Sequence, residues 1–220
     1  MKSGNATRVA LDVALAATLV AVMATALVQE APHEWLGVAL FGLTAAHMVV
    51  NRAWLATMFR GRRRALRVLQ VIVIVGLVAC VVGLIASSLV ISKHAFGFLP
   101  ALPGAGWARS VHMLCSHWMF VLAFAHVGLH VRDMRGLASW QAWALRVVFA
   151  SVACFGAYSF VRLNLWAYLT GQVQFAFVDP GIPLAISLAR YASVAVLLAG
   201  VFHYVRAGIV FAARRRRRRS

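Results

Sequence analysis

The sequence predicts an all-helical membrane protein with six transmembrane spans. Of its 220 residues, 63% are hydrophobic and only 12% are charged, and apolar runs of span length recur along the chain. A soluble domain carries about a quarter charged residues, whereas about 20 apolar residues are enough to cross a hydrocarbon core of roughly 30 Å. The mean hydropathy of +0.83 agrees with this class. We therefore expect residues 1–220 to form a single integral membrane domain.

Apolar runs bounded by charged residues or by Pro and Gly mark the individual spans. We expect these spans at Val9–Val28, Glu34–Leu55, Val68–Ile91, Val111–Val131, Ala144–Tyr168 and Leu184–Ala213. The first run is too long for a signal-peptide core and contains Asp12, so we expect it to stay as an anchor. All three cysteines lie inside apolar runs without a CxxC pattern, which excludes a zinc ribbon and a c-type haem.

The basic residues fall mostly on one side of the predicted spans. Eighteen of the 22 lie on the side that holds both termini, and the other side holds Lys93, Arg109, Arg162 and Arg190. The positive-inside rule then predicts a multi-pass protein of the cytoplasmic membrane with both termini in the cytoplasm. The six-arginine run at residues 214–219 could be a nucleic-acid arm in another context. Beside a span, however, basic residues fix topology and meet anionic lipid, so we expect lipid and no nucleic acid as partner.

Two pairs of histidines share one spacing. His33 and His47 bracket the second span and are 14 residues apart, as are His112 and His126 on the fourth. Fourteen residues make about four helical turns, so the members of a pair face the same way and lie about 21 Å apart along the axis. Because the two spans run parallel, we expect His33 to lie level with His112, and His47 level with His126.

Two facing histidines at one depth can supply both axial ligands of a haem. The spacing therefore predicts two b-type haems, an outer one at His33/His112 and an inner one at His47/His126. His130 shares the face of His126 and is an alternative inner ligand. The simpler alternative is that the histidines are bonded separately to neighbouring carbonyls or hydroxyls.

Other residues could support such cofactors. Gly37 lies one turn after His33 and would let a porphyrin approach the backbone, although ordinary helix packing explains small residues equally well. Gly128, between His126 and His130, has the same two interpretations. Arg109, one turn before His112, could neutralise haem propionates. Asp12 lies one turn after Arg8, and is either its ion-pair partner or a proton-exchange group at an inner quinone site.

Several short stretches around these histidines resemble a known family. They are His33-Glu34-Trp35-Leu36-Gly37, His47-Met48-Val49-Val50-Asn51-Arg52, His112-Met113-Leu114, His126-Val127-Gly128-Leu129-His130, Arg162, Trp166-Ala167-Tyr168-Leu169 and Phe175-Ala176-Phe177-Val178-Asp179. The chain is similar along nearly its whole length to the bacterial flavinylation-associated cytochrome family, formerly a domain of unknown function. The resemblance implies a cytochrome b-like four-helix haem core over about residues 9–131, with additional helices over about 144–213.

The resemblance also implies a function. It suggests a subunit that relays electrons across the cytoplasmic membrane, between quinone or another donor and an extracytoplasmic flavin-carrying protein. This would be the electron-transfer subunit of an oxidoreductase system rather than a stand-alone enzyme. The segment from Phe175 to Pro183 is a candidate docking surface or a plain re-entrant loop. The alternative function is a His-lined metal transporter or metal-binding scaffold, although the acidic residues lie near span ends rather than at the midplane that transport sites use.

Overall fold

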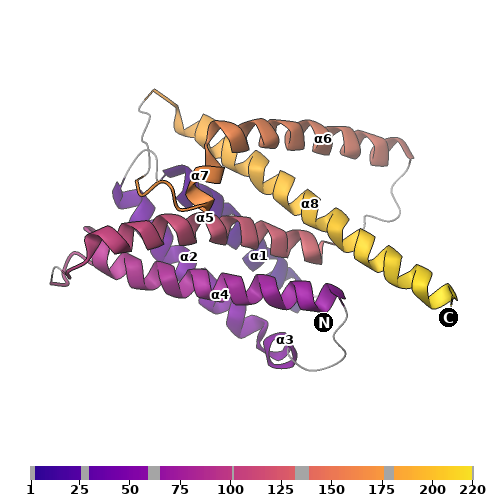
Figure 1. Cartoon of the computed structure of the whole chain (residues 1–220), viewed down its shortest axis with the longest axis horizontal. Helices are drawn as coiled ribbons and strands as arrows, with labels where there is room; N and C mark the ends of the chain where they lie inside the picture. The colour runs from indigo at the N-terminus through magenta and orange to yellow at the C-terminus, as the bar shows by residue number, and fades with distance from the viewer. Residues whose placement is uncertain are drawn as a thin grey trace.

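The computed structural model is a bundle of helices and describes residues 3–25, 30–58, 65–100, 102–131, 139–175 and 181–219. Its elements are α1 (Ser3–Thr25), α2 (Glu30–Val50), α3 (Arg52–Thr57), α4 (Ala65–Ile91), α5 (Ala105–His130), α6 (Ser139–Arg162), α7 (Leu165–Leu169) and α8 (Leu184–Arg219). All except the short α3 and α7 are long and apolar enough to cross a membrane, which confirms the six predicted spans (Figure 1). Both termini lie toward the same end of the bundle, as an even number of spans requires.

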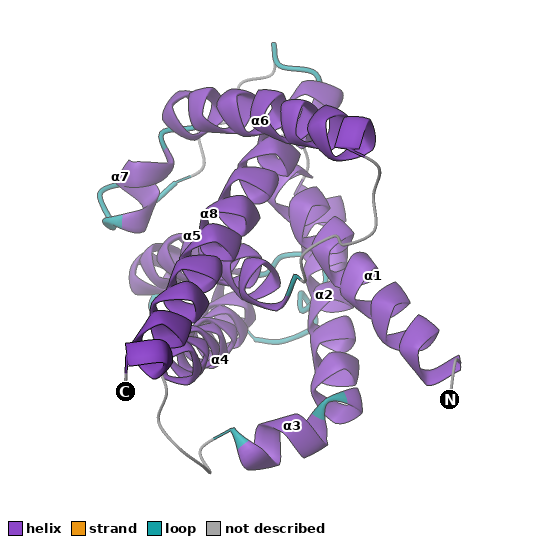
Figure 2. Ribbon diagram, turned by 90° about the vertical axis from the view of Figure 1, so that its right-hand side faces the viewer, coloured by secondary structure: helices purple, strands orange, loops and turns teal. Residues whose placement is uncertain are grey.

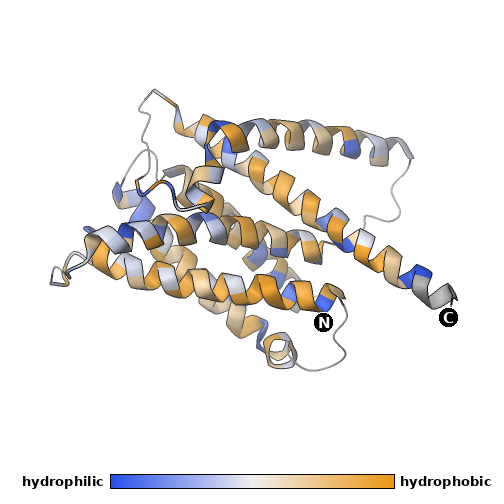
Figure 3. Cartoon of the chain, viewed as in Figure 1, coloured by the Kyte–Doolittle hydropathy of each residue, from blue (hydrophilic) through white to orange (hydrophobic). Residues whose placement is uncertain are grey.

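The outer faces of the long helices are apolar (Figure 3). Large side chains such as Val75 and Val82 of α4, and Val148 of α6, are more than half exposed. A water-soluble protein rarely presents continuous apolar surface of this kind, whereas lipid tails solvate it without cost. The exposed apolar surface thus supports the assignment of a lipid-embedded chain.

Two of the predicted spans end earlier in the structure than in the sequence-based prediction, which set their ends at Leu55 and Tyr168. Helix α2 ends at Val50, and Asn51 has φ −103° and ψ 13° before the separate helix α3 begins. Helix α6 ends at Arg162, and Asn164 has a left-handed φ of 49°. Asparagine tolerates such non-helical conformations because its short side chain bonds locally, which hydropathy does not register.

Helix α8 joins the parts of the bundle together. It packs against α5, α6 and α1, while α1 pairs with α2 and α4 pairs with α5 (Figure 2). Tyr191 and Val194 of α8 lie in the same buried cluster as Phe120 and Phe124 of α5. The helix nearest the C-terminus is therefore part of the buried hydrophobic core of the bundle.

Helix α2 stands apart from α4 and α5. Within the described chain, its close backbone neighbours are α1 and the short α3 that follows it. Leu40 of α2 nevertheless belongs to the same buried cluster as Phe120 and Phe124 of α5, so side chains rather than close backbone contacts join α2 to this part of the bundle. His33 of α2 and His112 of α5, which the sequence predicts to form the outer pair, face each other between these helices.

Gly128 of α5 is a packing residue. A Cβ atom at this position would collide with the backbone carbonyl of Ala199 in α8 and would lie 3.0 Å from the Cβ of Phe202. Of the two interpretations given by the sequence, the structure supports close helix packing rather than room for a porphyrin. The same kind of contact joins Gly156 of α6 to Ser193 of α8.

We expect Gly128→Ala to destabilise the bundle by about 1–3 kcal/mol, because the added methyl forces two backbones apart. Thermal unfolding in detergent, followed by circular dichroism, measures the effect. Gly208→Ala in α8 is the control, since its Cβ would meet no atom within 4 Å and alanine favours a helix. Equal unfolding temperatures for the two variants would contradict the packing role of Gly128.

Candidate functional site

A cavity of about 630 Å³ lies at one end of the bundle. Residues of α1, α2, α4, α5, α7 and α8 line it, together with Ser92, Lys93, Ala95 and Phe96 after α4, and Phe175. Its size is within the range of about 300–1,000 Å³ that cofactor pockets occupy. Both predicted outer ligands, His33 and His112, are on its wall, as are Gly37 and Arg109. The cavity therefore gathers the predicted outer site from residues up to 79 positions apart in the sequence.

The rings of His33 and His112 face each other. Their centres are 6.1 Å apart and their planes are inclined at 66°. Two imidazoles that bind one metal from opposite sides, each through a nitrogen about 2 Å from the metal, have ring centres about 6 Å apart. The observed separation therefore suits bis-histidine ligation.

Each of these two rings is held through its Nδ1 atom. Nδ1 of His33 is 3.0 Å from the carbonyl oxygen of Val22, to which it can donate. Nδ1 of His112 lies 3.3 Å from the hydroxyl of Ser87 and 3.4 Å from that of Ser88. Histidines that bind metals are commonly fixed in this way, with one nitrogen bonded to the protein and the other presented to the metal. The contacts leave Nε2 of both rings for a ligand in the cavity.

Gly37 gives the cavity additional room on the α2 side. It lines the cavity one turn after His33, and a Cβ atom built on it meets nothing within 4 Å. Gly42, further along the same helix, is equally unobstructed but does not line the cavity. The open space beside Gly37 suits a flat cofactor that passes close to the backbone.

One cation on the cavity wall is available to an anionic group. The guanidinium of Arg109 lies 5.6 Å from the centre of the Phe175 ring, and among the described residues no carboxylate pairs with it. Lys93, by contrast, is paired with Glu30 at 3.0 Å. Of these two cations, Arg109 is therefore the one free to meet a carboxylate such as a haem propionate.

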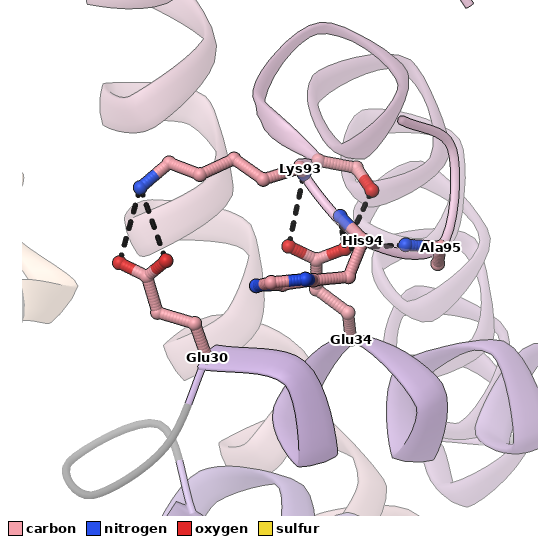
Figure 4. Close-up of polar contacts among 6 residues, drawn as sticks. Glu30, Glu34, Lys93, His94 and Ala95 are labelled. Carbon is pink, nitrogen blue, oxygen red and sulfur yellow. Dashed lines mark hydrogen bonds and ion pairs between the residues drawn. The ribbon is translucent and has the colours of Figure 1, made fainter. Parts of the chain in front are cut away.

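Glu34 fastens the cavity end of α2 to the chain after α4 (Figure 4). Its carboxylate accepts hydrogen bonds from the Ser92 hydroxyl at 2.6 Å and from the backbone N–H groups of Lys93, His94 and Ala95 at 2.8 to 3.0 Å. Such convergent donors make a strong site for an anionic group. Glu34 thus compensates for the missing backbone contact between α2 and α4.

The predicted inner ligand His47 has a charged partner. Its Nδ1 atom is 2.9 Å from the Oδ1 atom of Asp12 in α1. The sequence suggested Arg8 as the partner of Asp12, but the close polar contact that the structure gives to Asp12 is with His47. Asn51 donates to the carbonyl oxygen of His47 at 3.0 Å, and its amide nitrogen is 3.5 Å from each nitrogen of the ring.

The predicted partner on α5, His126, has a buried nitrogen without a protein partner. Its Nδ1 atom is enclosed and forms no hydrogen bond, which in a native protein calls for an explanation such as a bound group. His126 is near enough to His130 and His47 to interact electrostatically with both, but no ring contact between His47 and His126 is described. The inner pair is thus less closely juxtaposed than the outer pair.

The alternative inner ligand His130 lies at the exposed end of α5. Its ring centre is 4.4 Å from that of His126 and 6.1 Å from the ring of Trp54 in α3. Its Nδ1 atom lies 3.0 Å from the carbonyl oxygen of His126. The structure brings His130 close to the same level, so the choice of ligand between His126 and His130 stays open.

The structure places a further histidine, His117, on the cavity wall. Its buried ring stacks on Tyr168 of α7, with centres 4.2 Å apart and planes at 2°, and its Nδ1 atom is 2.8 Å from the Met113 carbonyl. A stacked histidine and tyrosine from distant parts of the chain leave no signal in the spacing of the sequence.

The predicted docking segment from Phe175 to Pro183 is described only in part, because the chain from 176 to 180 lies outside the described residues.

Comparisons of the chain with models of protein families, with curated proteins and with solved structures give no significant match. Within the described part of the chain there is also no group of three or more His, Cys, Asp or Glu residues that could hold a metal ion by themselves. The interpretation of the site therefore depends on its own geometry, in which His33 and His112 form the close pair.

We expect Glu34→Gln to loosen the turn at residues 93–95. The amide has one acceptor oxygen instead of two and presents an NH₂ group to backbone donors, so their hydrogen bonds weaken. Amide hydrogen exchange at residues 93–95 should become faster. Glu30→Gln removes the same charge without touching these N–H groups and serves as control; unchanged exchange in Glu34→Gln would contradict the fastening role.

Proposed function

We propose that this chain is a di-haem b-type membrane cytochrome that relays electrons between the two faces of a cytoplasmic membrane. The observation that carries the proposal is the pair His33 and His112, whose rings face each other at 6.1 Å on the wall of one cavity. Each ring has its Nδ1 atom engaged with the protein, which is how axial ligands are oriented. The cavity, the open space at Gly37 and the unpaired Arg109 support a haem rather than a bare metal ion.

The second haem is proposed at the other level of the same two helices. His47 is oriented by Asp12, and His126 has a buried nitrogen with no protein partner. Both lie 14 residues, about four turns, from the outer pair. Two cofactors at this spacing would stand near opposite faces of the bilayer.

The residues of the chain have distinct tasks in this proposal. The four histidines bind, the Val22 carbonyl, the serines and Asp12 orient them, and Arg109 meets the propionates of the first haem. The apolar helices keep water from the cofactors. Haem, when bound, supplies a one-electron couple whose potential depends on its ligands and surroundings. We further propose an extracytoplasmic flavin-carrying protein as one redox partner, and quinone as a candidate for the other.

Spectroscopy of the purified protein tests the proposal directly. We expect two haems per chain with the reduced-minus-oxidised bands of low-spin b-type haem. His33→Ala and His112→Ala should each lose one haem, and the same one, because they remove two ligands of one iron. His47→Ala should lose the other. His94→Ala, which changes an exposed histidine of the loop after α4, should keep both.

A haem-free wild-type protein would overturn the proposal, and so would two haems that survive in both His33→Ala and His112→Ala. A colourless protein that binds a transition metal instead would favour the transporter or scaffold. In that case, the metal content should fall in the same histidine variants.

Filling the space at Gly37 gives an independent test. We expect Gly37→Leu to lower occupancy of the His33/His112 haem several-fold, because the side chain would enter the cavity, while leaving the other haem bound. Gly42→Leu places the same side chain on the same helix outside the cavity and should retain both haems. Pyridine haemochromogen assays on the two variants measure the difference, and equal occupancies would count against a cofactor beside Gly37.

A further inference from the structure

The two histidine levels differ in the charge of the groups that hold them. At the His33/His112 level the partners are neutral: a backbone carbonyl at 3.0 Å and two serine hydroxyls at 3.3 and 3.4 Å. At the other level, His47 contacts the carboxylate of Asp12 at 2.9 Å. The fold therefore supplies a negatively charged partner to one ligand of the His47/His126 level, and uncharged hydrogen-bond partners to both ligands of the other.

We infer that Asp12 is a positioning residue for His47 and that it makes the His47/His126 haem the lower-potential haem of the two. This inference rests on the proposed function and adds an order of potentials to it. Neither of the two interpretations that the sequence offered for Asp12, an ion pair with Arg8 or a proton-exchange group at a quinone site, includes this effect on a haem potential.

The orienting effect follows from the contact itself. A carboxylate only accepts hydrogen bonds, so the proton of a neutral His47 must be on Nδ1, and the lone pair must be on Nε2. Asp12 is in the middle of α1, which packs along α2, so its position relative to His47 is set by helix packing. His47 is thus presented to a metal in one tautomer and one orientation.

The effect on potential follows from the charge of the partner. A carboxylate that accepts a proton from a ligand imidazole makes that imidazole a more basic ligand than a carbonyl or hydroxyl does. A more basic ligand stabilises the ferric state over the ferrous state and so lowers the reduction potential. The neutral partners of His33 and His112 raise the basicity of these imidazoles less, so they lower the reduction potential of the iron less.

The other charges near the two levels do not reverse this order. Arg8 and Arg52 flank the Asp12 and His47 positions on their own helices, but among the described residues neither forms an ion pair with Asp12, whose carboxylate contacts His47 directly at 2.9 Å. At the other level, the guanidinium of Arg109 favours the less positive ferrous state. The carboxylate of Glu34 is already compensated by three backbone N–H groups and one hydroxyl.

Spectroelectrochemistry of the full-length protein in detergent tests the inference. The His47→Ala variant first identifies which of the two potentials belongs to the His47 level, because that component disappears. We expect Asp12→Asn to shift that component to a higher potential and to leave the other unchanged. Asp12→Glu should bring it back toward the wild-type value, and Arg146→Gln, which removes an exposed charge from α6, a helix that does not line the cavity, should shift neither.

The potentials and haem contents of the Asp12 variants either support or overturn the inference. Wild-type potentials at both haems in Asp12→Asn would overturn the inference while leaving the proposed function intact. If Asp12→Asn holds only one haem, a second haem regained in Asp12→Glu supports the inference, and one missing there too overturns it. A wild-type protein without haem would instead overturn the proposed function itself.

Discussion

An imidazole inside a lipid bilayer needs a partner, because no water is present to satisfy its nitrogens, and much of this structure follows from that constraint. His33 and His112 each engage the protein through one nitrogen and face each other across the space between α2 and α5. The helices that carry them are not packed together, since α2 associates with α1 and α5 with α4 and α8. The bundle thus separates two helices whose polar residues face the same cavity.

The sequence predicted the architecture well wherever hydropathy or helical period decides it. Six spans follow from apolar runs. The pairing of His33 with His112 at one level follows from the 14-residue interval that the two helices share, because spacing along a helix determines both the face and the depth of a residue. It failed at the ends of α2 and α6, where single asparagines leave the helical conformation. The haem assignment and the family resemblance stay predictions that the proposed experiments address.

What the sequence could not provide is which helices become neighbours. The contact of Asp12 with His47 joins α1 to α2, and the stack of His117 on Tyr168 joins α5 to α7. Both depend on tertiary packing between segments, which has no periodic signature. The same holds for Glu34, whose four donors come from a turn about 60 residues away. Local patterns predicted the candidate ligands, therefore, but not the residues that orient them.

The isolation of α2 bears on how the protein is assembled. Besides Leu40 in the shared buried cluster, its attachments are the pairing with α1 and the fastening of Glu34 at one end. A ligand that binds only the folded chain adds to its stability, so under the proposed function a haem held between α2 and α5 would join two helices that share few close backbone contacts. Loading with the cofactor would then protect the chain against proteolysis.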